Sequence, residues 1–441
     1  MPIENACDED LQGAEERPVP GSSGYRFFVL GMMFLVYMMN YIDRQIVVIL
    51  AEPIKREFGL MDWQLGFLTG TAFALLYATL GIPIARLADR ANRVHIIAVA
   101  LTVWSAMTML CGAATSFAQL AVARVGVGVG EAGGSPPAVS LIASYFGPAR
   151  RATAMSVYSL GATVGILVGF SLAGWIASTH GWRTAFVAAG LPGLLLAIAV
   201  RLWVAEPRSS HSRAGAARPP PALRETLGIL MSIPAWRFLN AAAVAAGIAV
   251  YGFMAWMPVY LIRRFGVSTQ EVGTAVGLAA GLAGSVGVFL GGWWADRLGR
   301  VDARRQLLAP ALSTLMFPLA AYLALHAQSW ERSIVFLVPA YGLCLAYTGP
   351  TWAALQGAAP PEMRAMAAAI LLFLVNLLGL GLGPQLVGLV SDLNAADGVA
   401  GLRTAICMVC STSIVASLCF YRGVSAGRAV SPSDRSASSP G

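Results

Sequence analysis

The chain has 441 residues, of which 57% are hydrophobic and only 12% are charged. Soluble domains carry about 25% charged residues, so this composition excludes an ordinary soluble protein and predicts an integral membrane protein. Basic residues exceed acidic ones by 30 to 22. The excess is not gathered in one segment, which argues against the basic face of a nucleic-acid-binding protein.

Long apolar runs follow one another along the chain. A helix that spans a bilayer needs about 20 mostly apolar residues, and twelve runs satisfy this requirement. We therefore expect an all-α polytopic membrane protein with twelve transmembrane helices. The runs lie near 27–51, 63–87, 94–115, 117–145, 152–178, 183–204, 236–262, 270–295, 306–326, 333–357, 365–390 and 402–422.

A polar stretch divides these runs into two groups of six. The segment 205–235 contains "RSSHSRAGAARPPP" and is too charged to enter a bilayer. It predicts a cytoplasmic linker between an N-terminal bundle at 25–204 and a C-terminal bundle at 236–423. Residues 1–24 are acidic, without the basic lead and apolar core of a cleaved signal peptide, and 424–441 are rich in serine. Both predict disordered cytoplasmic tails.

The distribution of arginine predicts the orientation. The connections "ARLADRANR", "GPARR" and "ADRLGRVDARR" are basic, as is the linker, whereas alternate connections such as "GAATSFAQ" are nearly uncharged. Because basic loops stay in the cytoplasm, we expect both termini there. Lys55 is the only lysine beside many arginines, which is typical of a GC-rich bacterial genome. The predicted location is therefore a bacterial inner membrane.

The two groups of helices are related to each other. "ADRANR" at 88–93 recurs 207 positions later as "ADRLGR" at 295–300, and "GWRTAF" at 181–186 is matched by "GLRTAI" at 401–406. Six-helix repeats in the same direction imply a pseudo-two-fold axis along the membrane normal, with a substrate site between the halves.

The repeated loop resembles the major facilitator superfamily, and the resemblance covers the whole transmembrane length. Its signature between the second and third helices, G-x-x-x-D-R-x-G-R, matches "GWWADRLGR" at 292–300. The first copy departs from the signature, with Ala85 and Asn92 where glycines are usual. The superfamily's fourth-helix signature, R-x-x-x-G-x-G-E-A, is present as "RVGVGVGEA" at 124–132.

Three stretches resemble the Spinster branch of that superfamily most: "NYIDRQ" at 40–45, "GVGEAGGSPPA" at 128–138 and "GWRTAF". Members of this branch move lysophospholipids and sphingoid lipids. Branches that symport anions also carry N-Y-x-D-R on the first helix, so a small organic-anion symporter remains an alternative. The resemblance further implies a cytoplasmic gate, although loop arginines could also serve topology alone. The gate candidates are Asp89, Arg90, Arg93, Asp296, Arg297 and Arg300.

Four charged residues fall inside predicted membrane helices. Arg124 and Glu131 are seven residues apart, which places them on one helix face, and Asp43 and Arg44 lie in the first helix. Charges at this depth are costly and usually mark a substrate or proton path. We expect these residues in one cavity wall, where Glu131 or Asp43 takes up a proton. The alternative is a static ion-pair network that only holds the helices together.

The glycines of the fourth helix also match a dinucleotide-binding fingerprint, Gly128-x-Gly130-x-x-Gly133. That fingerprint requires a preceding strand and an acidic residue about 20 positions later, and the sequence has neither. No cofactor and no metal are expected. Glycines four residues apart instead predict close helix packing. They are Gly126, Gly130 and Gly134 on the fourth helix and Gly161, Gly165 and Gly169 on the fifth.

The C-terminal half has no ionisable side chain except tyrosine at comparable depth, so its share of the substrate wall is predicted to be apolar and aromatic. Such a wall suits an amphiphile with one charged head and a long tail. The candidates are Tyr251, Trp256, Tyr260, Tyr347, Trp352, Gln356, Phe373 and Asn376.

These observations favour a secondary active transporter that works by alternating access. The leading prediction is a proton-coupled transporter of a lysophospholipid or sphingoid lipid, acting as a monomer among membrane lipids and without nucleic acid. A small organic-anion/proton symporter is the second hypothesis, and a transport-inactive membrane sensor or interaction protein is the third. An enzyme is not expected, because the four histidines lie near helix ends or in the linker: His95, His180, His211 and His326.

Overall fold

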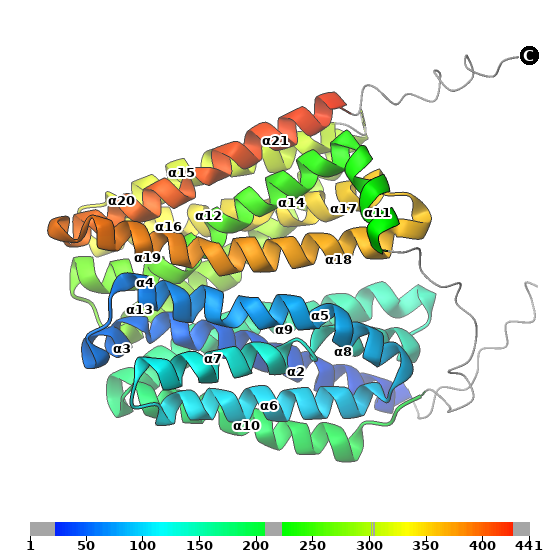
Figure 1. Cartoon of the computed structure of the whole chain (residues 1–441), viewed down its shortest axis with the longest axis horizontal. Coiled ribbons are helices and arrows are strands. Elements are labelled where there is room, and N and C mark those ends of the chain that lie inside the picture. The colour runs from blue at the N-terminus through cyan, green and yellow to red at the C-terminus, as the bar shows by residue number, and fades with distance from the viewer. Residues whose placement is uncertain (1–22, 208–222, 301, 303–304, 427–441) are drawn as a thin grey trace, which may run out of the picture.

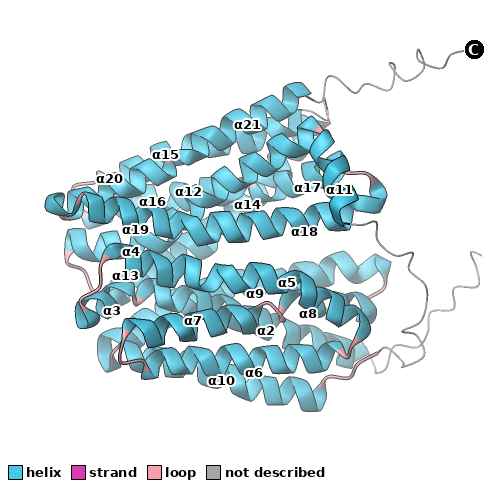
Figure 2. Ribbon diagram, viewed as in Figure 1, coloured by secondary structure: helices cyan, strands magenta, loops and turns pink. Residues whose placement is uncertain are grey.

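A computed structural model describes residues 23–207, 223–300, 302 and 305–426. Within these ranges the chain forms helices and no strand (Figure 2). Nearly all of the predicted tails, and 208–222 of the predicted linker, lie outside the described residues. Eleven helices in the described part are long and apolar enough to cross a membrane.

The remaining predicted span, which is the fourth in the chain at 117–145, is present as two shorter helices. These are α7 (Phe117–Glu131) and α8 (Ser135–Tyr145). Pro136 and Pro137 follow the break and have no backbone N–H, so the hydrogen-bond ladder of α7 cannot continue through them. The break leaves Glu131 as the last residue of α7.

The other helices fall into two groups that agree with the predicted halves. In the N-terminal bundle they are α2 (Ser23–Ile49), α3 (Ala51–Phe58), α4 (Asp62–Gly66), α5 (Ala72–Arg90), α6 (Arg93–Ala113), α9 (Pro148–His180) and α10 (Trp182–Trp203). A short helix, α11 (Leu223–Ser232), precedes the C-terminal bundle. That bundle contains α12 (Pro234–Phe265), α13 (Thr269–Leu278), α14 (Gly284–Gly299), α15 (Leu308–Leu325), α16 (Trp330–Ala346), α17 (Thr348–Ala358), α18 (Arg364–Leu374), α19 (Gly381–Leu393), α20 (Val399–Cys410) and α21 (Thr412–Ala426).

Three membrane helices contain a π-helical turn. The turns are Phe67–Thr71 between α4 and α5, Ala279–Ala283 between α13 and α14, and Val375–Leu380 between α18 and α19. The first two lie in the second membrane helix of each half. A π-helical turn locally widens a helix and is frequent at functional sites.

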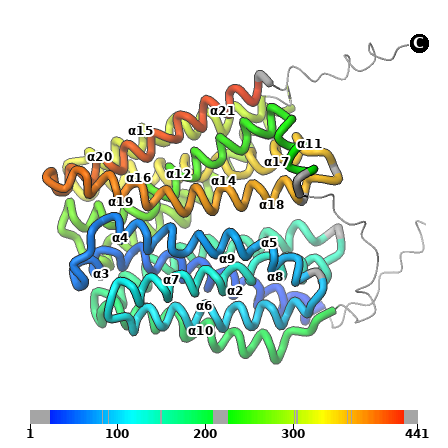
Figure 3. The backbone as a smooth tube through the Cα atoms, in the orientation of Figure 1, coloured from blue at the N-terminus to red at the C-terminus, as the bar shows by residue number. Residues whose placement is uncertain are grey.

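The two bundles lie side by side with their helices roughly parallel (Figures 1 and 3). The start of α2, the end of α10, helix α11 and the end of α21 are at one end of the molecule, which we call the terminal end. Helices α3, α4 and α20 are at the opposite, distal end.

Small residues allow the helices to approach closely, as predicted. A Cβ atom on Gly130 would lie 2.5 Å from the backbone nitrogen of Trp104 on α6, and one on Gly165 would lie 2.5 Å from the carbonyl oxygen of Met38 on α2. Both distances are well below van der Waals contact. The packing role of these glycines is therefore confirmed.

Candidate substrate cavity and its charged residues

A cavity of about 740 Å³ lies between the two bundles. Helices α2 and α9 line it from the N-terminal half, and α12 and α14 line it from the C-terminal half. All three π-helical turns contribute to the wall, through Thr69, Gly281 and Leu380. The position between pseudo-symmetric halves is the one predicted from the sequence repeats.

Arg44 and Glu131 form an ion pair beside this cavity. The Nε atom of Arg44 donates to Oε2 of Glu131 at 2.7 Å, and the Glu131 side chain is fully buried. The guanidinium also lies over the rings of Phe73 and Tyr77, 5.0 and 4.6 Å from their centroids. Cation–π contacts of this kind stabilise a cation that has lost its water. Arg44 itself lines the cavity.

Arg124 lines the same cavity but contacts no carboxylate. Its Nε and Nη1 atoms donate to the backbone carbonyl oxygens of Leu68 and Asp43, both at 3.3 Å, and its side chain is buried. Phe73 lies between the two arginines, 5.4 Å from the Arg124 guanidinium. Arg124 therefore carries a positive charge that no ion pair among the described residues neutralises.

The carboxyl group of Asp43 is buried behind the cavity wall. Only 1% of Asp43 is exposed, and its Oδ1 atom has no hydrogen-bond partner. The hydroxyl of Thr108 and the indole nitrogen of Trp104, which belong to α6, are likewise buried without partners. These two groups lie close to the Asp43 carboxyl but form no hydrogen bond of standard geometry with it. An ionised carboxylate that accepts no hydrogen bond and pairs with no cation is costly in such a place. The structure thus brings all four predicted charges together but pairs only Arg44 with Glu131.

The predicted aromatic wall is partly where it was expected. Tyr251 and Tyr347 line the cavity, and most other lining residues of the C-terminal half are apolar, such as Met254, Val288 and Leu345. The wall therefore has the predicted chemical character, but it is built mainly from residues that the sequence did not single out.

Six of the predicted wall residues lie outside the lining of this cavity. The indole of Trp256 donates to the carbonyl of Pro384 at 2.8 Å inside the core, and the Tyr260 hydroxyl donates to the carbonyl of Leu325. Asn376 donates to the carbonyl of Leu372 in its own helix. The remaining three are Trp352 and Gln356 on α17, and Phe373, which lines a separate groove.

The gate candidates lie at the terminal end, where no hydrogen bond or ion pair between described residues joins the halves. Arg93 is fully buried and binds Glu206, the carbonyl of Ser140 and the hydroxyl of Ser144, all within the N-terminal half. The Arg297 guanidinium lies over the ring of Trp293, 5.5 Å from its centroid. Arg297 is exposed, as are Arg90, Asp296 and Arg300. The side chain of Asp89 is outside the described part of the structure.

The halves are instead joined at the distal end by an arginine that the sequence analysis did not identify. Arg263, near the end of α12, donates to both carboxylate oxygens of Asp62 at 2.8 Å and to Glu52 at 2.7 Å. Lys55 and the hydroxyl of Ser391 also bind Asp62. We call this set the distal clasp.

An acid of one half also caps a helix of the other half at this end. The carboxylate of Asp392, at the end of α19, accepts the backbone N–H groups of Asp62 and Trp63 at 3.0 and 2.7 Å. These are the first N–H groups of α4, where the helix dipole favours a negative charge. This cap between the halves is at the distal end, opposite to the end that holds the predicted gate residues.

The motif "GWRTAF" has a structural role in the N-terminal half. The indole of Trp182 donates to Glu57 at 2.6 Å, and Arg183 binds the same carboxylate at 2.5 Å. These hydrogen bonds, that from Trp182 foremost, lower the pKa of Glu57. They tie α3 to the start of α10. Gly181 between α9 and α10 has a φ of 83°, a conformation that favours glycine.

Comparison with known proteins agrees with the fold and the cavity, which together define a multi-pass membrane transporter. A model of the Major Facilitator Superfamily matches residues 33–384, and the chain belongs to this superfamily. An MFS-type efflux pump of Mycolicibacterium smegmatis is 35% identical over 89% of this chain and 91% of its own length. A probable galactarate/D-glucarate transporter of Bacillus subtilis is 28% identical over 80% of this chain and 83% of its own length.

A solved structure is similar over nearly the whole chain. It is the crystal structure of a bacterial homolog to the human lysosomal transporter Spinster, in an inward-facing and unoccupied conformation. The TM-score is 0.83 at 29% identity, and the match covers 93% of this chain and 100% of that one. The predicted resemblance to the Spinster branch is therefore confirmed. Among the described residues, no group of three His, Cys, Asp or Glu side chains could hold a metal ion.

Proposed function

We propose that this transporter moves an amphiphile with an anionic head group, such as a lysophospholipid or a phosphorylated sphingoid lipid, by alternating access. The observation that carries the proposal is the composition of the central cavity. Arg44 and Arg124 lie on the N-terminal side, and an apolar, aromatic wall faces them from the C-terminal side.

The two sides of the cavity suit different parts of such a substrate. Arg124 has no carboxylate partner, so an anionic head group would supply its missing counter-ion. A hydrocarbon tail would lie against residues such as Met254, Val288 and Phe289. The volume of about 740 Å³ is within the ~300–1,000 Å³ typical of ligand sites.

Proton coupling is the second part of the proposal, and we assign the proton to Asp43. Glu131 already has the Arg44 guanidinium as its partner, whereas the Asp43 carboxyl is buried without one. Asp43 therefore holds a proton in this conformation. When the halves rock and water reaches the site from the other side, Asp43 releases the proton and pairs with Arg124, which frees the substrate.

The conformation suits one step of that cycle. Among the described residues, several ion pairs and hydrogen bonds join the two halves. All of them lie at the distal end or in the middle of the membrane helices. We propose that the terminal end faces the cytoplasm of a bacterial cell, that the protein resides in the inner membrane as a monomer, and that this state is inward-facing.

A small organic-anion/proton symporter is the second candidate function. It is favoured by the similarity to a probable galactarate/D-glucarate transporter, and Arg44 and Arg124 would serve a carboxylate equally well. The C-terminal wall argues against it, because its polar groups are few hydroxyls such as Ser285 and Thr348. A sugar acid needs many hydrogen bonds to replace its water.

The deciding experiment measures uptake into proteoliposomes of purified protein. Labelled lysophospholipid and galactarate are compared, each with and without a proton gradient of either direction. We expect lysophospholipid movement that the gradient accelerates, loss of movement in Arg124→Gln, and normal movement in the matched control Arg201→Gln. Gradient-driven flux of galactarate alone would establish the second candidate. Absence of flux for both compounds would favour a transport-inactive sensor.

A further inference from the structure

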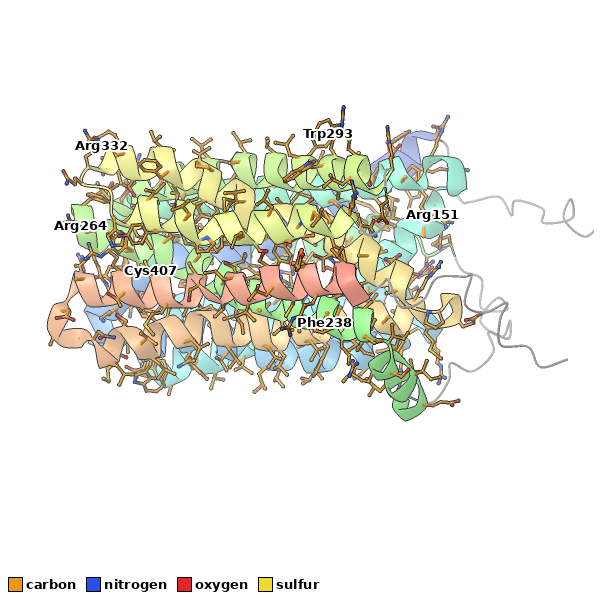
Figure 4. The ribbon with its side chains drawn as sticks, turned by 90° about the horizontal axis from the view of Figure 1, so that it is seen from above. Arg151, Phe238, Arg264, Trp293, Arg332 and Cys407 are labelled. Carbon is orange, nitrogen blue, oxygen red and sulfur yellow. The ribbon has the colours of Figure 1, made fainter. Side chains whose placement is uncertain are left out.

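A second, separate groove lies on the outside of the C-terminal bundle. Its volume is about 840 Å³, and it runs between α11, the first half of α12 and α18. It shares no lining residue with the central cavity. Figure 4 shows the neighbouring side chain of Phe238 on the part of α12 that lies toward the terminal end. The groove is therefore independent of the transport path.

Most of the groove wall is apolar. Leu227 and Met231 contribute from α11, Val244 and Ile248 from α12, and Ile370 from α18. Met231 is 52% exposed although it is apolar, as expected for a helix that rests in the membrane interface. A groove with such a wall offers acyl chains an apolar surface.

Three polar residues lie at the terminal end of the groove. Each of them has at least one side-chain polar atom that forms no hydrogen bond with a described residue. Arg237 lines the groove, is exposed and forms no ion pair with any described residue. Trp236 and Asn240 are 2% and 5% exposed, and the indole Nε1 of Trp236 and the Oδ1 of Asn240 are buried without a hydrogen-bond partner. Both atoms are enclosed by the protein, so Arg237 is the polar group that the groove presents to a ligand.

The length of the groove matches one leaflet of a bilayer. Arg237 is in the first turn of α12, and Ile248 lies eleven residues further along the same helix. At about 1.5 Å per residue, the two are separated by roughly 16 Å along the helix axis. Half of the hydrocarbon core of a bilayer is about 15 Å thick. The charge thus falls at head-group level, and the apolar wall spans the depth of one set of acyl chains.

We propose that this groove binds one anionic phospholipid from the leaflet at the terminal end, as a resident ligand and not as the transported substrate. The phosphate faces Arg237, and an acyl chain covers the apolar wall. Because the groove is built from α11 as well as α12 and α18, the lipid holds α11 against the C-terminal bundle. The proposal does not depend on which substrate the central cavity carries.

The test uses the full-length protein in detergent and native mass spectrometry with added phosphatidylglycerol or phosphatidylcholine. We expect one tightly retained phosphatidylglycerol in the wild type. Arg237→Gln should weaken phosphatidylglycerol retention at least tenfold, with little effect on phosphatidylcholine. Arg201→Gln is the matched control, because Arg201 is also exposed near the terminal end but lies outside the groove, and it should bind like the wild type.

Two further experiments distinguish a specific lipid-binding site from nonspecific adhesion of lipid to the protein. Ala245→Trp and the more exposed Ala241→Phe fill the groove without removing a charge, and either should abolish retention of the bound lipid. Inorganic phosphate at millimolar concentration should fail to displace the lipid. The proposal is overturned if Arg237→Gln and a groove-filling variant both retain phosphatidylglycerol like the wild type, or if phosphate alone displaces it.

Discussion

Arg263 binds both carboxylate oxygens of Asp62 at 2.8 Å, across the boundary between the two bundles. Two parallel N–H···O bonds of this kind are strong and fix the orientation of both groups. Lys55 and Ser391 bind the same carboxylate, and Asp392 caps the helix that begins at Asp62. The proposed alternating access requires this distal clasp to open, so the strength of the clasp would set part of the balance between the two states.

The first prediction follows from the clasp. Arg263→Ala should shift the equilibrium at least tenfold toward a state that is open at the distal end, because Asp62 and Glu52 lose their cross-bundle partner. A tenfold change in the equilibrium constant corresponds to about 1.4 kcal/mol. This is below the ~3–5 kcal/mol that breaking a fully buried ion pair costs, because the Arg263 side chain is 15% exposed.

Spin labels at Met61→Cys and Ala396→Cys, which are exposed on opposite halves, would report the opening as a longer distance. Arg332→Ala removes an exposed arginine at the same end and should leave the distance distribution unchanged. An unchanged distribution in Arg263→Ala as well would mean that the clasp does not control the distal closure.

The second prediction separates the two buried acids. Asp43→Asn should still exchange substrate at equal pH but should fail to concentrate it under a proton gradient, because the variant has no proton to release. Glu131→Gln should instead lower thermal stability in detergent, because it leaves Arg44 without its counter-ion, at a cost of up to about 3 kcal/mol.

The two readouts are gradient-driven uptake in proteoliposomes and the melting temperature. Full gradient-driven uptake in both variants would contradict proton coupling through this site. A large loss of thermal stability in both variants, with gradient-driven uptake unchanged, would establish the static ion-pair network.

The third prediction concerns orientation. Arg151 and Arg332 are exposed and lie at opposite ends of the molecule (Figure 4). In a cysteine-free protein, Arg332→Cys should react with a membrane-impermeant thiol reagent in intact cells, whereas Arg151→Cys should react only after permeabilisation. The reverse pattern would place the termini outside, and reaction of both positions in intact cells would contradict the proposed topology.

The fourth prediction concerns helix packing. Gly165→Ala should lower the melting temperature, because its Cβ would lie 2.5 Å from the backbone oxygen of Met38. Overpacking of this kind costs about 1–3 kcal/mol. Gly31→Ala is the matched control on α2, where a Cβ meets nothing within 4 Å, and it should not lower the melting temperature. Equal melting temperatures for both variants would mean that α2 and α9 can separate freely.

The sequence by itself determined the class of protein, the number and order of its membrane-spanning segments and the relation between its halves. Hydrophobic runs of about 20 residues have few other uses, because only a helix satisfies its backbone within a bilayer. The sequence also located the four buried charges, because a charged residue inside an apolar run is recognisable without knowledge of how the helices pack. The pairing of Arg44 with Glu131, 87 residues apart, is known from the structure alone.

Only the tertiary structure decided which partner each charge has and which faces of the helices form the cavity. Glu52, Asp62, Arg263 and Asp392 lie near helix ends, where charges are ordinary. The distal clasp joins residues as far as 329 positions apart. In the C-terminal half, helices such as α12 are apolar on all sides, so no periodicity marks the inner face. Packing rotates Trp256 and Tyr260 into the core and Tyr251 into the cavity, and that rotation is set by neighbouring helices distant in the sequence.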